Sequence, residues 1–225
     1  TCPIRARITQ TGYGVIVPDN HLPLNVEIPV DDGLYVTDNE TGKCKLLVSI
    51  KDIIDKAVPA FNLDKYQSGE FYGFQCKWNP QGTRLLFVLR WITKDRKYRK
   101  NHVITMKSDG TDIHVAIPSE EWGKGGHHIN WCPDGEYLSM NLDIDGDGLR
   151  FIKVKYDGMD LHKILDNISG SGHPSIHRNG KYLITDAYNE DTVAYKDGTV
   201  PIRLVNLETG TDEHIIRIKT QNPFD

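Results

Sequence analysis

Three polar side chains recur at one position of a repeated pattern, and they are the residues of this chain best suited to chemistry. The pattern is a short apolar run, a polar turn that ends in glycine, and a second apolar run. Counting back seven residues from the glycine of each turn leads to Gln75, His128 and His173. An imidazole titrates near neutral pH, so it can transfer protons or bind a metal ion, and an amide can hydrogen bond to hydroxyl groups. The repetition predicts that these three side chains share one face of the protein.

A structural role is the alternative interpretation of both histidines. An imidazole that follows glycine at the start of a strand can hydrogen bond to the turn of a neighbouring repeat, and clustered ionisable groups indicate a site only statistically. His127 is a further candidate. Adjacent residues of a strand face opposite ways, so either His127 or His128 points toward the predicted site. The sequence alone leaves these interpretations open.

The turns around these positions predict β-hairpins. Glycine supplies the positive φ that a tight turn requires, and the flanking runs have the composition of strands. A second signature, a polar turn ending in glycine before another strand-like run, alternates with the first along the chain. The turn glycines are Gly82, Gly135 and Gly180 in the first signature and Gly42, Gly110, Gly158 and Gly210 in the second. Together they define units of four strands, about 45 to 50 residues long, which is the period of β-propeller blades.

We therefore expect an all-β fold, a β-propeller of four-stranded antiparallel blades that forms a single domain over residues 1–225. Four blades lie at the low end of the range known for propellers, so we expect this chain to be part of a larger ring with further blades. Apolar residues at helical spacing before Pro59 predict a helical or irregular insertion. The approximate blades are residues 1–50, 69–118, 125–166 and 171–219, and the insertion is residues 51–68.

The composition is that of a soluble globular protein and argues against several kinds of partner. Of the 225 residues, 38% are hydrophobic and 26% are charged, and a net charge of −4 gives no global basic field for nucleic acid. No apolar run approaches the roughly 18 to 20 residues of a membrane helix, so we expect no membrane partner. Because the sequence opens on Thr1, we expect a periplasmic or secreted protein whose leader has been removed. The four scattered cysteines argue against zinc-ribbon and redox motifs and against a disulfide framework. They are Cys2, Cys44, Cys76 and Cys132.

Two charged segments have both a functional and a structural interpretation. The basic segment 94–100 could contact an anionic polysaccharide, or it could be a solvated hairpin tip. Asp143, Asp145 and Asp147 have the D-x-D-x-D-G spacing of a calcium loop, in which alternate carboxylates supply hard oxygen ligands. Val154 occupies the twelfth position, where such loops close with glutamate, so an acidic turn without calcium is the alternative.

The turns at residues 78–82 and 131–135 have the form W-x-P-x-G and, with the Asp-Gly turns that follow them, resemble TolB-type propeller repeats. This resemblance covers nearly the whole chain. Within it, the H-x-x-W stretch that begins at His128 and the pair His173–Pro174 resemble oligogalacturonate lyases and propeller polysaccharide lyases of the ulvan lyase type. The narrower resemblance implies β-elimination on a uronic-acid polymer, with His128 as the base and His173 as a ligand of a transition metal. That family completes its metal site with Gln and His residues of a later blade, which this sequence does not include.

The implied reaction removes the proton at C5 of a uronate, which requires a base of near-neutral pKa and a cation beside the carboxylate. Under this resemblance His128 is the predicted base, with His127 as the alternative. Tyr188 could protonate the leaving oxygen and Arg203 could bind the carboxylate. The alternative for each is an aromatic or an arginine side chain that fills an ordinary strand position. The predicted substrate-binding residues are Gln75, Lys77, Arg90 and His177.

The resemblance also implies a cofactor and a partner. A divalent metal ion (Mn, Zn or Ca) is the expected cofactor, and an anionic polysaccharide or oligouronide is the expected partner. The alternative function is a non-catalytic propeller that binds a protein or a glycan through the same face, because TolB-type repeats serve several functions.

Overall fold

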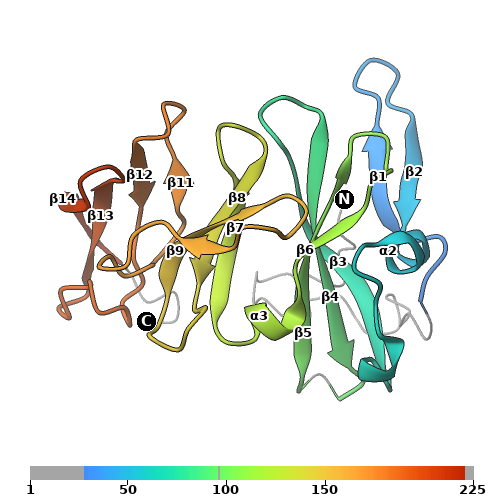
Figure 1. Cartoon of the computed structure of the whole chain (residues 1–225), viewed down its shortest axis with the longest axis horizontal. Coiled ribbons are helices and arrows are strands. Elements are labelled where there is room, and N and C mark those ends of the chain that lie inside the picture. The colour runs from blue at the N-terminus through green and yellow to red at the C-terminus, as the bar shows by residue number, and fades with distance from the viewer. Residues whose placement is uncertain (1–27, 96, 221–225) are drawn as a thin grey trace. The chain divides into compact units, whose positions relative to one another are not determined.

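A computed structural model describes residues 28–95 and 97–220. Cys2 and more than half of the first predicted blade, residues 1–27, lie outside the described residues. In the described part, three sheets of four antiparallel strands follow one another along the chain, each with its strands in sequence order (Figure 1). A two-stranded sheet precedes them. This repeated four-stranded unit confirms the predicted fold class, because the chain is all-β and forms a partial β-propeller.

The chain forms two compact units, one ending at Ser119 and the other beginning at Glu120. In the described part of the first unit, the hairpin β1-β2 is followed by two short helices and the sheet β3-β4-β5-β6. These elements are β1 (Gly33–Thr37), β2 (Cys44–Ser49), α2 (Ile50–Lys56), η2 (Leu63–Lys65), β3 (Gly69–Trp78), β4 (Arg84–Thr93), β5 (Arg99–Lys107) and β6 (His114–Ile117).

The helix α2 begins directly after β2 because Ser49 caps it. The Ser49 hydroxyl accepts a hydrogen bond from the backbone N of Asp52 at 2.9 Å, and the Asp52 carboxylate bonds back to Ser49, which makes a capping box. Hydrogen bonds from Lys56 and Ser49 lower the pKa of Asp52 to about 2. Ile50 and Ile53 are fully buried and pack in one core with apolar side chains of β3, β4, β5 and β6. The helix therefore stabilises the first four-stranded sheet.

The second unit contains the sheets β7-β8-β9-β10 and β11-β12-β13-β14. A shared core joins them, in which Cys132 and Phe151 pack in one cluster with Leu183 and Val205. The elements are α3 (Ser119–Trp122) at the boundary of the units, β7 (Gly126–Trp131), β8 (Tyr137–Leu142), β9 (Arg150–Lys155), β10 (His162–Lys163), β11 (Ser175–Ile176), β12 (Tyr182–Thr185), β13 (Thr199–Asn206) and β14 (Thr211–Lys219).

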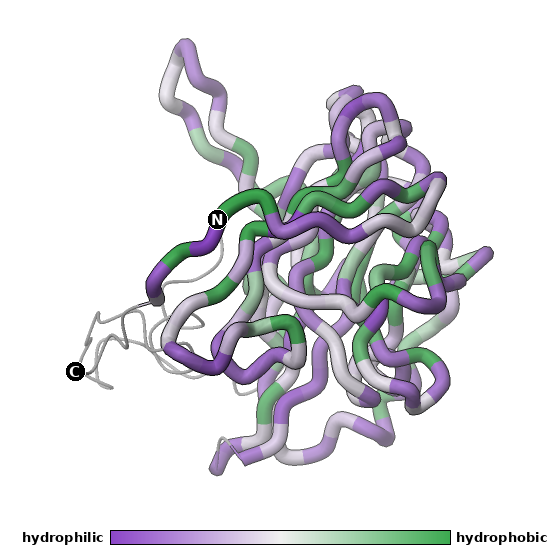
Figure 2. The backbone as a smooth tube through the Cα atoms, turned by 90° about the vertical axis from the view of Figure 1, so that its left-hand side faces the viewer, coloured by the Kyte–Doolittle hydropathy of each residue, from purple (hydrophilic) through white to green (hydrophobic). Residues whose placement is uncertain are grey.

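The hairpin turns predicted from glycine are confirmed. Gly82, Gly135 and Gly180 have φ angles of 68°, 72° and 74°, in the left-handed region that a side chain disfavours. The side chain just before the glycine supports the turn, since Asp134 Oδ1 accepts a hydrogen bond from the backbone N of Tyr137 at 2.9 Å. Figure 2 shows that hydrophobic and hydrophilic stretches alternate along the backbone.

An aspartate of the second signature anchors each four-stranded sheet. It stands two residues after the turn glycine and binds a side chain of a central strand. The pairs are Asp112–Arg84 at 2.8 Å, Asp160–Tyr137 at 2.8 Å and Asp212–Arg203 at 2.6 Å. The hydrogen bond from Arg84 is the main reason why the pKa of Asp112 lies below its ordinary value. These carboxylates therefore have a structural role.

Two expectations from composition concern cysteines and membrane helices. Cys44, Cys76 and Cys132 are free thiols, and burial raises the pKa of the Cys132 thiol to about 11. In the described residues no helix is long and apolar enough to cross a membrane.

Candidate functional site

The first strand of the second unit carries a bulge at the predicted histidines. The register of the β7–β8 pairing shifts between His127 and Asn130. His128 and Ile129 therefore share one partner position on β8, which is the arrangement of a β-bulge. His128 has a φ of 60°, which is uncommon for a residue with a Cβ. At this bulge the rings of His127 and His128 lie 4.8 Å apart, so both histidines contribute to the same site.

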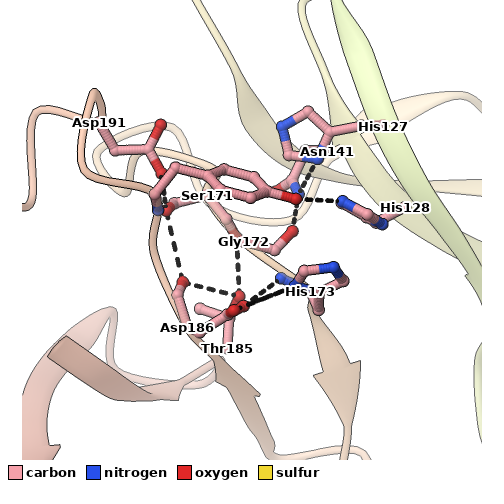
Figure 3. A network of polar contacts seen from close by, with 10 residues as sticks. His127, His128, Asn141, Ser171, Gly172, His173, Thr185, Asp186 and Asp191 are labelled. Atoms are coloured by element: carbon pink, nitrogen blue, oxygen red, sulfur yellow. Dashed lines mark hydrogen bonds and ion pairs between the residues drawn. The ribbon is translucent and has the colours of Figure 1, made fainter. Parts of the chain in front are cut away.

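The next sheet brings a third histidine and a tyrosine to this pair. Tyr188 follows β12, and its hydroxyl lies 2.5 Å from Nε2 of His128. His173 precedes β11, and its ring centroid lies 3.8 Å from that of His128. The ring of His127 lies 5.7 Å from the ring of Tyr188. These four side chains, His127, His128, His173 and Tyr188, are called the histidine cluster (Figure 3).

A carboxylate orients the third histidine. Both carboxylate oxygens of Asp186 lie 3.0 Å from Nδ1 of His173, and Oδ1 also accepts a hydrogen bond from the backbone N of His173 at 2.6 Å. Partial burial acts to raise the pKa of Asp186, but the hydrogen bonds from His173 outweigh it and hold that pKa below its ordinary value of 3.8. Asp186 is therefore ionised at neutral pH and acts as an acceptor. Gly172 permits this close approach, because a Cβ there would lie 2.2 Å from the backbone oxygen of Asp186.

A buried amide supports the first histidine. Asn141 is completely buried, and its Nδ2 donates hydrogen bonds to the carbonyl oxygen of Gly172 at 2.8 Å and to Nδ1 of His127 at 3.2 Å. Burial lowers the pKa of His127 below its ordinary value of 6.5, and the nearby carboxylates of Asp191 and Asp186 act in the opposite direction without reversing the effect. His127 is therefore neutral at neutral pH.

Further buried groups support the tyrosine. The hydroxyl of Ser171 donates to the carboxylate of Asp191, which also accepts a hydrogen bond from the backbone N of Tyr188 at 2.8 Å. Thr185 in turn donates to the carbonyl oxygen of Ser171 at 2.7 Å. Ser171 and Thr185 are 1% and 3% exposed, whereas Tyr188 is 37% exposed. The cluster thus presents an accessible phenol above buried polar groups that hydrogen bond to one another.

The histidine cluster combines groups that donate and accept protons near neutral pH. The His128–Tyr188 hydrogen bond connects an imidazole with a phenol, a pair that can pass a proton in either direction. His173 is fixed by a carboxylate, and its side chain is 57% exposed, so a ligand can reach it. The arrangement is suited to general acid–base chemistry on a polar ligand bound at the surface.

The structure gives Arg203 a role different from the predicted one. Its side chain is completely buried and binds the carboxylate of Asp212 through Nε and Nη2, with the shorter contact at 2.6 Å. Its Nη1 donates to the carbonyl oxygen of Ser169 at 3.0 Å. A guanidinium held inside the protein in this way cannot bind the carboxylate of a substrate. The catalytic role predicted for Arg203 is corrected to a structural one.

The predicted substrate-binding residues lie on two strands and in one turn. Gln75 and Lys77 belong to β3 and Arg90 to β4, all in the first unit. Arg90 is 7% exposed, and its guanidinium carbon lies 3.3 Å from the ring centroid of Phe74. His177 lies in the turn after β11, where its Nδ1 accepts a backbone hydrogen bond at 3.3 Å. The roles of these four residues toward a substrate stay predictions.

The described residues do not fit the predicted metal sites. In the acidic loop, the carboxylate of Asp143 accepts hydrogen bonds from two backbone N–H groups. Asp145 forms an ion pair with Lys163, whose hydrogen bond lowers the pKa of Asp145, and also bonds to the backbone N of Asp147. In the part of the chain that the structure describes, no three His, Cys, Asp or Glu side chains are grouped so that they could hold a metal ion. This applies to His173 as well as to the loop.

Sequence reasoning missed the residues that support the cluster, although the repeat contains a signal for two of them. Counting six residues forward from the turn glycines Gly135 and Gly180 leads to Asn141 and Asp186. Both are polar residues in or next to a central strand, at the same position of successive repeats, as the histidines are. Ser171 and Asp191 have no comparable signal, because their bond depends on a loop that joins β12 to β13.

No protein-family model matches the sequence, and no curated protein matches it. Solved structures do match. The putative TolB from Agrobacterium tumefaciens is similar with a TM-score of 0.48 and 19% identity, over 66% of this chain and 50% of that chain. TolB from Acinetobacter baumannii has a TM-score of 0.48 and 12% identity, over 80% of this chain and 36% of that chain. An oligogalacturonate lyase in complex with manganese has a TM-score of 0.45 and 13% identity, over 85% of this chain and 61% of that chain.

The chain thus spans between 36% and 61% of the length of these three structures. TolB-like propellers and oligogalacturonate lyases, the two classes that the sequence resembles, are both among the solved structures to which the chain is similar. At these levels of identity the likeness concerns the fold, and the manganese ion is a property of that lyase.

Proposed function

We propose that this protein cleaves uronic-acid-containing glycans by β-elimination and that the histidine cluster supplies the acid and base groups. The observation that supports this most directly is the 2.5 Å hydrogen bond between His128 Nε2 and the Tyr188 hydroxyl. The ring of His173 lies 3.8 Å from that of His128. A proton donor and proton acceptors therefore lie close enough together to act on one sugar ring at the surface.

β-Elimination breaks bonds at two neighbouring carbons of the uronate. An imidazole of the cluster takes the proton from C5, the electron pair of that bond forms the C4=C5 double bond, and the bond from C4 to its glycosidic oxygen breaks. The Tyr188 hydroxyl, held by His128, gives its proton to the leaving oxygen. The proton taken from C5 returns to the phenolate through solvent, which restores the starting state.

A divalent metal ion as cofactor is predicted only by the resemblance to the lyases. The described residues do not group as a metal site, so no step of the proposed reaction runs through an ion. The substrate class is an anionic polysaccharide or oligouronide, which agrees with the periplasmic or secreted location expected from the sequence.

A direct assay tests the proposal. The 225-residue chain is incubated with oligogalacturonides and with ulvan-type oligosaccharides, and unsaturated ends are followed by their ultraviolet absorbance. Tyr188→Phe removes the proposed acid and should lower the rate on the order of 10²- to 10⁴-fold. Tyr182→Phe is a matched control, because Tyr182 lies on β12, the strand that precedes Tyr188, and is also 37% exposed.

The outcomes separate the two candidate functions. Loss of product in Tyr188→Phe with normal rates in Tyr182→Phe supports the lyase. Binding of uronides to the wild-type protein without any unsaturated product rules out the lyase and supports the non-catalytic binding module. Equal rates in wild type and Tyr188→Phe contradict the proposed role of the cluster.

A further inference from the structure

Two polar residues at equivalent repeat positions each hold one imidazole of the histidine cluster. Asn141 and Asp186 both stand six residues after a turn glycine, Asn141 bonded to His127 and Asp186 bonded to His173. One partner is an amide that donates, and the other is a carboxylate that accepts. We infer that they fix opposite tautomers, which makes His127 a hydrogen-bond donor and His173 the proton acceptor of the site.

The orientation of the Asn141 amide determines the tautomer of His127. The carbonyl oxygen of Gly172 can only accept, so the group that lies 2.8 Å from it must be the NH₂ end of the amide. The same NH₂ group lies 3.2 Å from Nδ1 of His127. Nδ1 of His127 is therefore an acceptor without a proton, and the proton of this neutral ring is on Nε2. Asn141 is completely buried, so water does not compete for these bonds.

The carboxylate of Asp186 determines the opposite tautomer in His173. An ionised carboxylate only accepts hydrogen bonds, so Nδ1 of His173, at 3.0 Å from both carboxylate oxygens, carries a proton. The additional bond from the backbone N of His173 to Asp186, at 2.6 Å, fixes the carboxylate relative to the ring. With a proton fixed on Nδ1, the position left for a lone pair is Nε2, and the side chain is 57% exposed.

These tautomers assign roles within the proposed reaction, and this part of the inference rests on the proposed function. Nε2 of His173 is the atom that takes the C5 proton, in place of the base that the sequence predicts, His128. His128 instead holds the hydroxyl of Tyr188, the proton donor to the leaving oxygen. The Nε2–H group of His127 is a donor for the negative charge that develops on the uronate carboxylate. Asn141 and Asp186 are positioning residues, since they act through the imidazoles.

Nitrogen-detected NMR of the histidine rings tests the tautomers without any substrate. In the wild-type protein at neutral pH, the ¹⁵N shifts and ring couplings should identify His127 as the Nε2–H form and His173 as the Nδ1–H form. Asp186→Asn should shift His173 away from a pure Nδ1–H form and leave His127 unchanged. Asn141→Leu should shift His127 away from a pure Nε2–H form and leave His173 unchanged. Asp191→Asn is the matched control, because that carboxylate bonds to Ser171 and to the backbone N of Tyr188 and to no imidazole.

The inference is overturned if both rings have the same tautomer, or if Asp186→Asn leaves the His173 pattern unchanged while circular dichroism shows a folded protein. A carboxylate on Nδ1 also orients metal-binding imidazoles, so Mn²⁺ is titrated into the same sample. Selective broadening of the His173 signals at micromolar Mn²⁺ assigns His173 to a metal ion and overturns its role as proton acceptor. Unchanged signals support that role.

A kinetic measurement connects the tautomers to the reaction. Asp186→Asn should lower kcat for uronide cleavage on the order of 10²- to 10⁴-fold with little change in KM, because it affects the base and not the binding of the sugar. If the wild-type chain shows the two tautomers and never cleaves uronides, the proposed function is wrong, while the assignment of His127 as donor and His173 as acceptor is confirmed. If it cleaves uronides and the tautomers differ from those assigned, the inference fails and the function stands.

Discussion

The strands β3 and β7 each begin a four-stranded sheet, and both contain a β-bulge, at neighbouring positions of the repeat. In β3 the register with β4 shifts between Gly73 and Gln75, and in β7 it shifts just after His127. Each bulge lies close to a glycine that stands nine residues before the turn glycine, Gly73 in one strand and Gly126 in the other. A feature shared in this way belongs to the repeat, so the bulge is by itself no sign of function.

The side chains at the two bulges differ completely. The first sheet has Phe74, whose ring lies under the guanidinium of Arg90 at 3.3 Å, and its strand β4 has the apolar Val88 where the second sheet has Asn141. The second sheet has His127 at the position of Phe74. One backbone arrangement therefore supports apolar and cation–π packing in the first unit and a polar, titratable cluster in the second. The two sheets therefore differ in the side chains at the bulge and not in having a bulge.

The largest expected effect on the rate of uronide cleavage comes from placing in the second sheet, at position 128, the glutamine that the first sheet has at position 75. His128→Gln copies the residue at position 75 and should lower uronide cleavage on the order of 10²-fold or more, because the partner of the Tyr188 hydroxyl is lost. The melting temperature should change little, since the ring is not part of the apolar core. His162→Gln, on the exposed strand β10, is the control. Unfolding of His128→Gln, or full activity, would contradict the difference between the sheets.

Two Arg–Asp pairs with buried arginines provide a second comparison between the units. Arg203 is 0% and Asp212 20% exposed, whereas Arg84 is 8% and Asp112 35% exposed. Arg203→Met should lower the free energy of unfolding by about 3–5 kcal/mol, because it leaves a mostly buried carboxylate without its cation. Arg84→Met should cost less, because water reaches Asp112. Urea unfolding measures both, and an Arg203→Met protein as stable as wild type would restore Arg203 as a candidate for substrate binding.

The two glycines before the bulges should differ in their tolerance of a methyl group. A Cβ on Gly73 would lie 2.4 Å from the buried ring of Phe87, which has little room to move. On Gly126 the closest atom, at 2.8 Å, is a terminal methyl group of Leu142. Gly73→Ala should cost about 1–3 kcal/mol and Gly126→Ala less. Thermal unfolding of the two variants gives the order, and the reverse order would show that Leu142 is the more rigid neighbour.

The smallest expected effect is a pH dependence of stability in the second unit. Burial holds the pKa of folded His127 below 6.5, so the unfolded chain binds this proton more readily than the folded chain. Stability should therefore be complete above pH 6.5 and fall as the pH drops below it. His127→Phe, which copies Phe74 of the first sheet, should lose less stability than wild type between pH 7 and pH 5. Melting temperatures across this range test it, and equal slopes would contradict the effect of burial.

The sequence by itself determined the blades and the equivalence of their positions. Turn glycines such as Gly135 fix the hairpins because a positive φ is a local requirement, and alternating apolar runs fix the strands for the same local reason. Counting from those glycines brought Gln75, His128 and His173 to one repeat position, and the structure brings the last two into contact. Tyr188 was predicted only as the proton donor to the leaving oxygen, and its contact with His128 comes from the structure.

Only the tertiary structure decided which groups these residues contact. The bonds that matter join residues far apart in sequence: Tyr188 lies 60 positions from His128, Gly172 lies 31 from Asn141, and Asp186 lies 13 from His173. Each depends on how two sheets, or a loop and a sheet, pack together. Arg203 shows the same limit, since a strand pattern does not say whether a guanidinium faces solvent or a buried carboxylate. Burial and side-chain partners are properties of the packed sheets, and a pattern along one strand does not contain them.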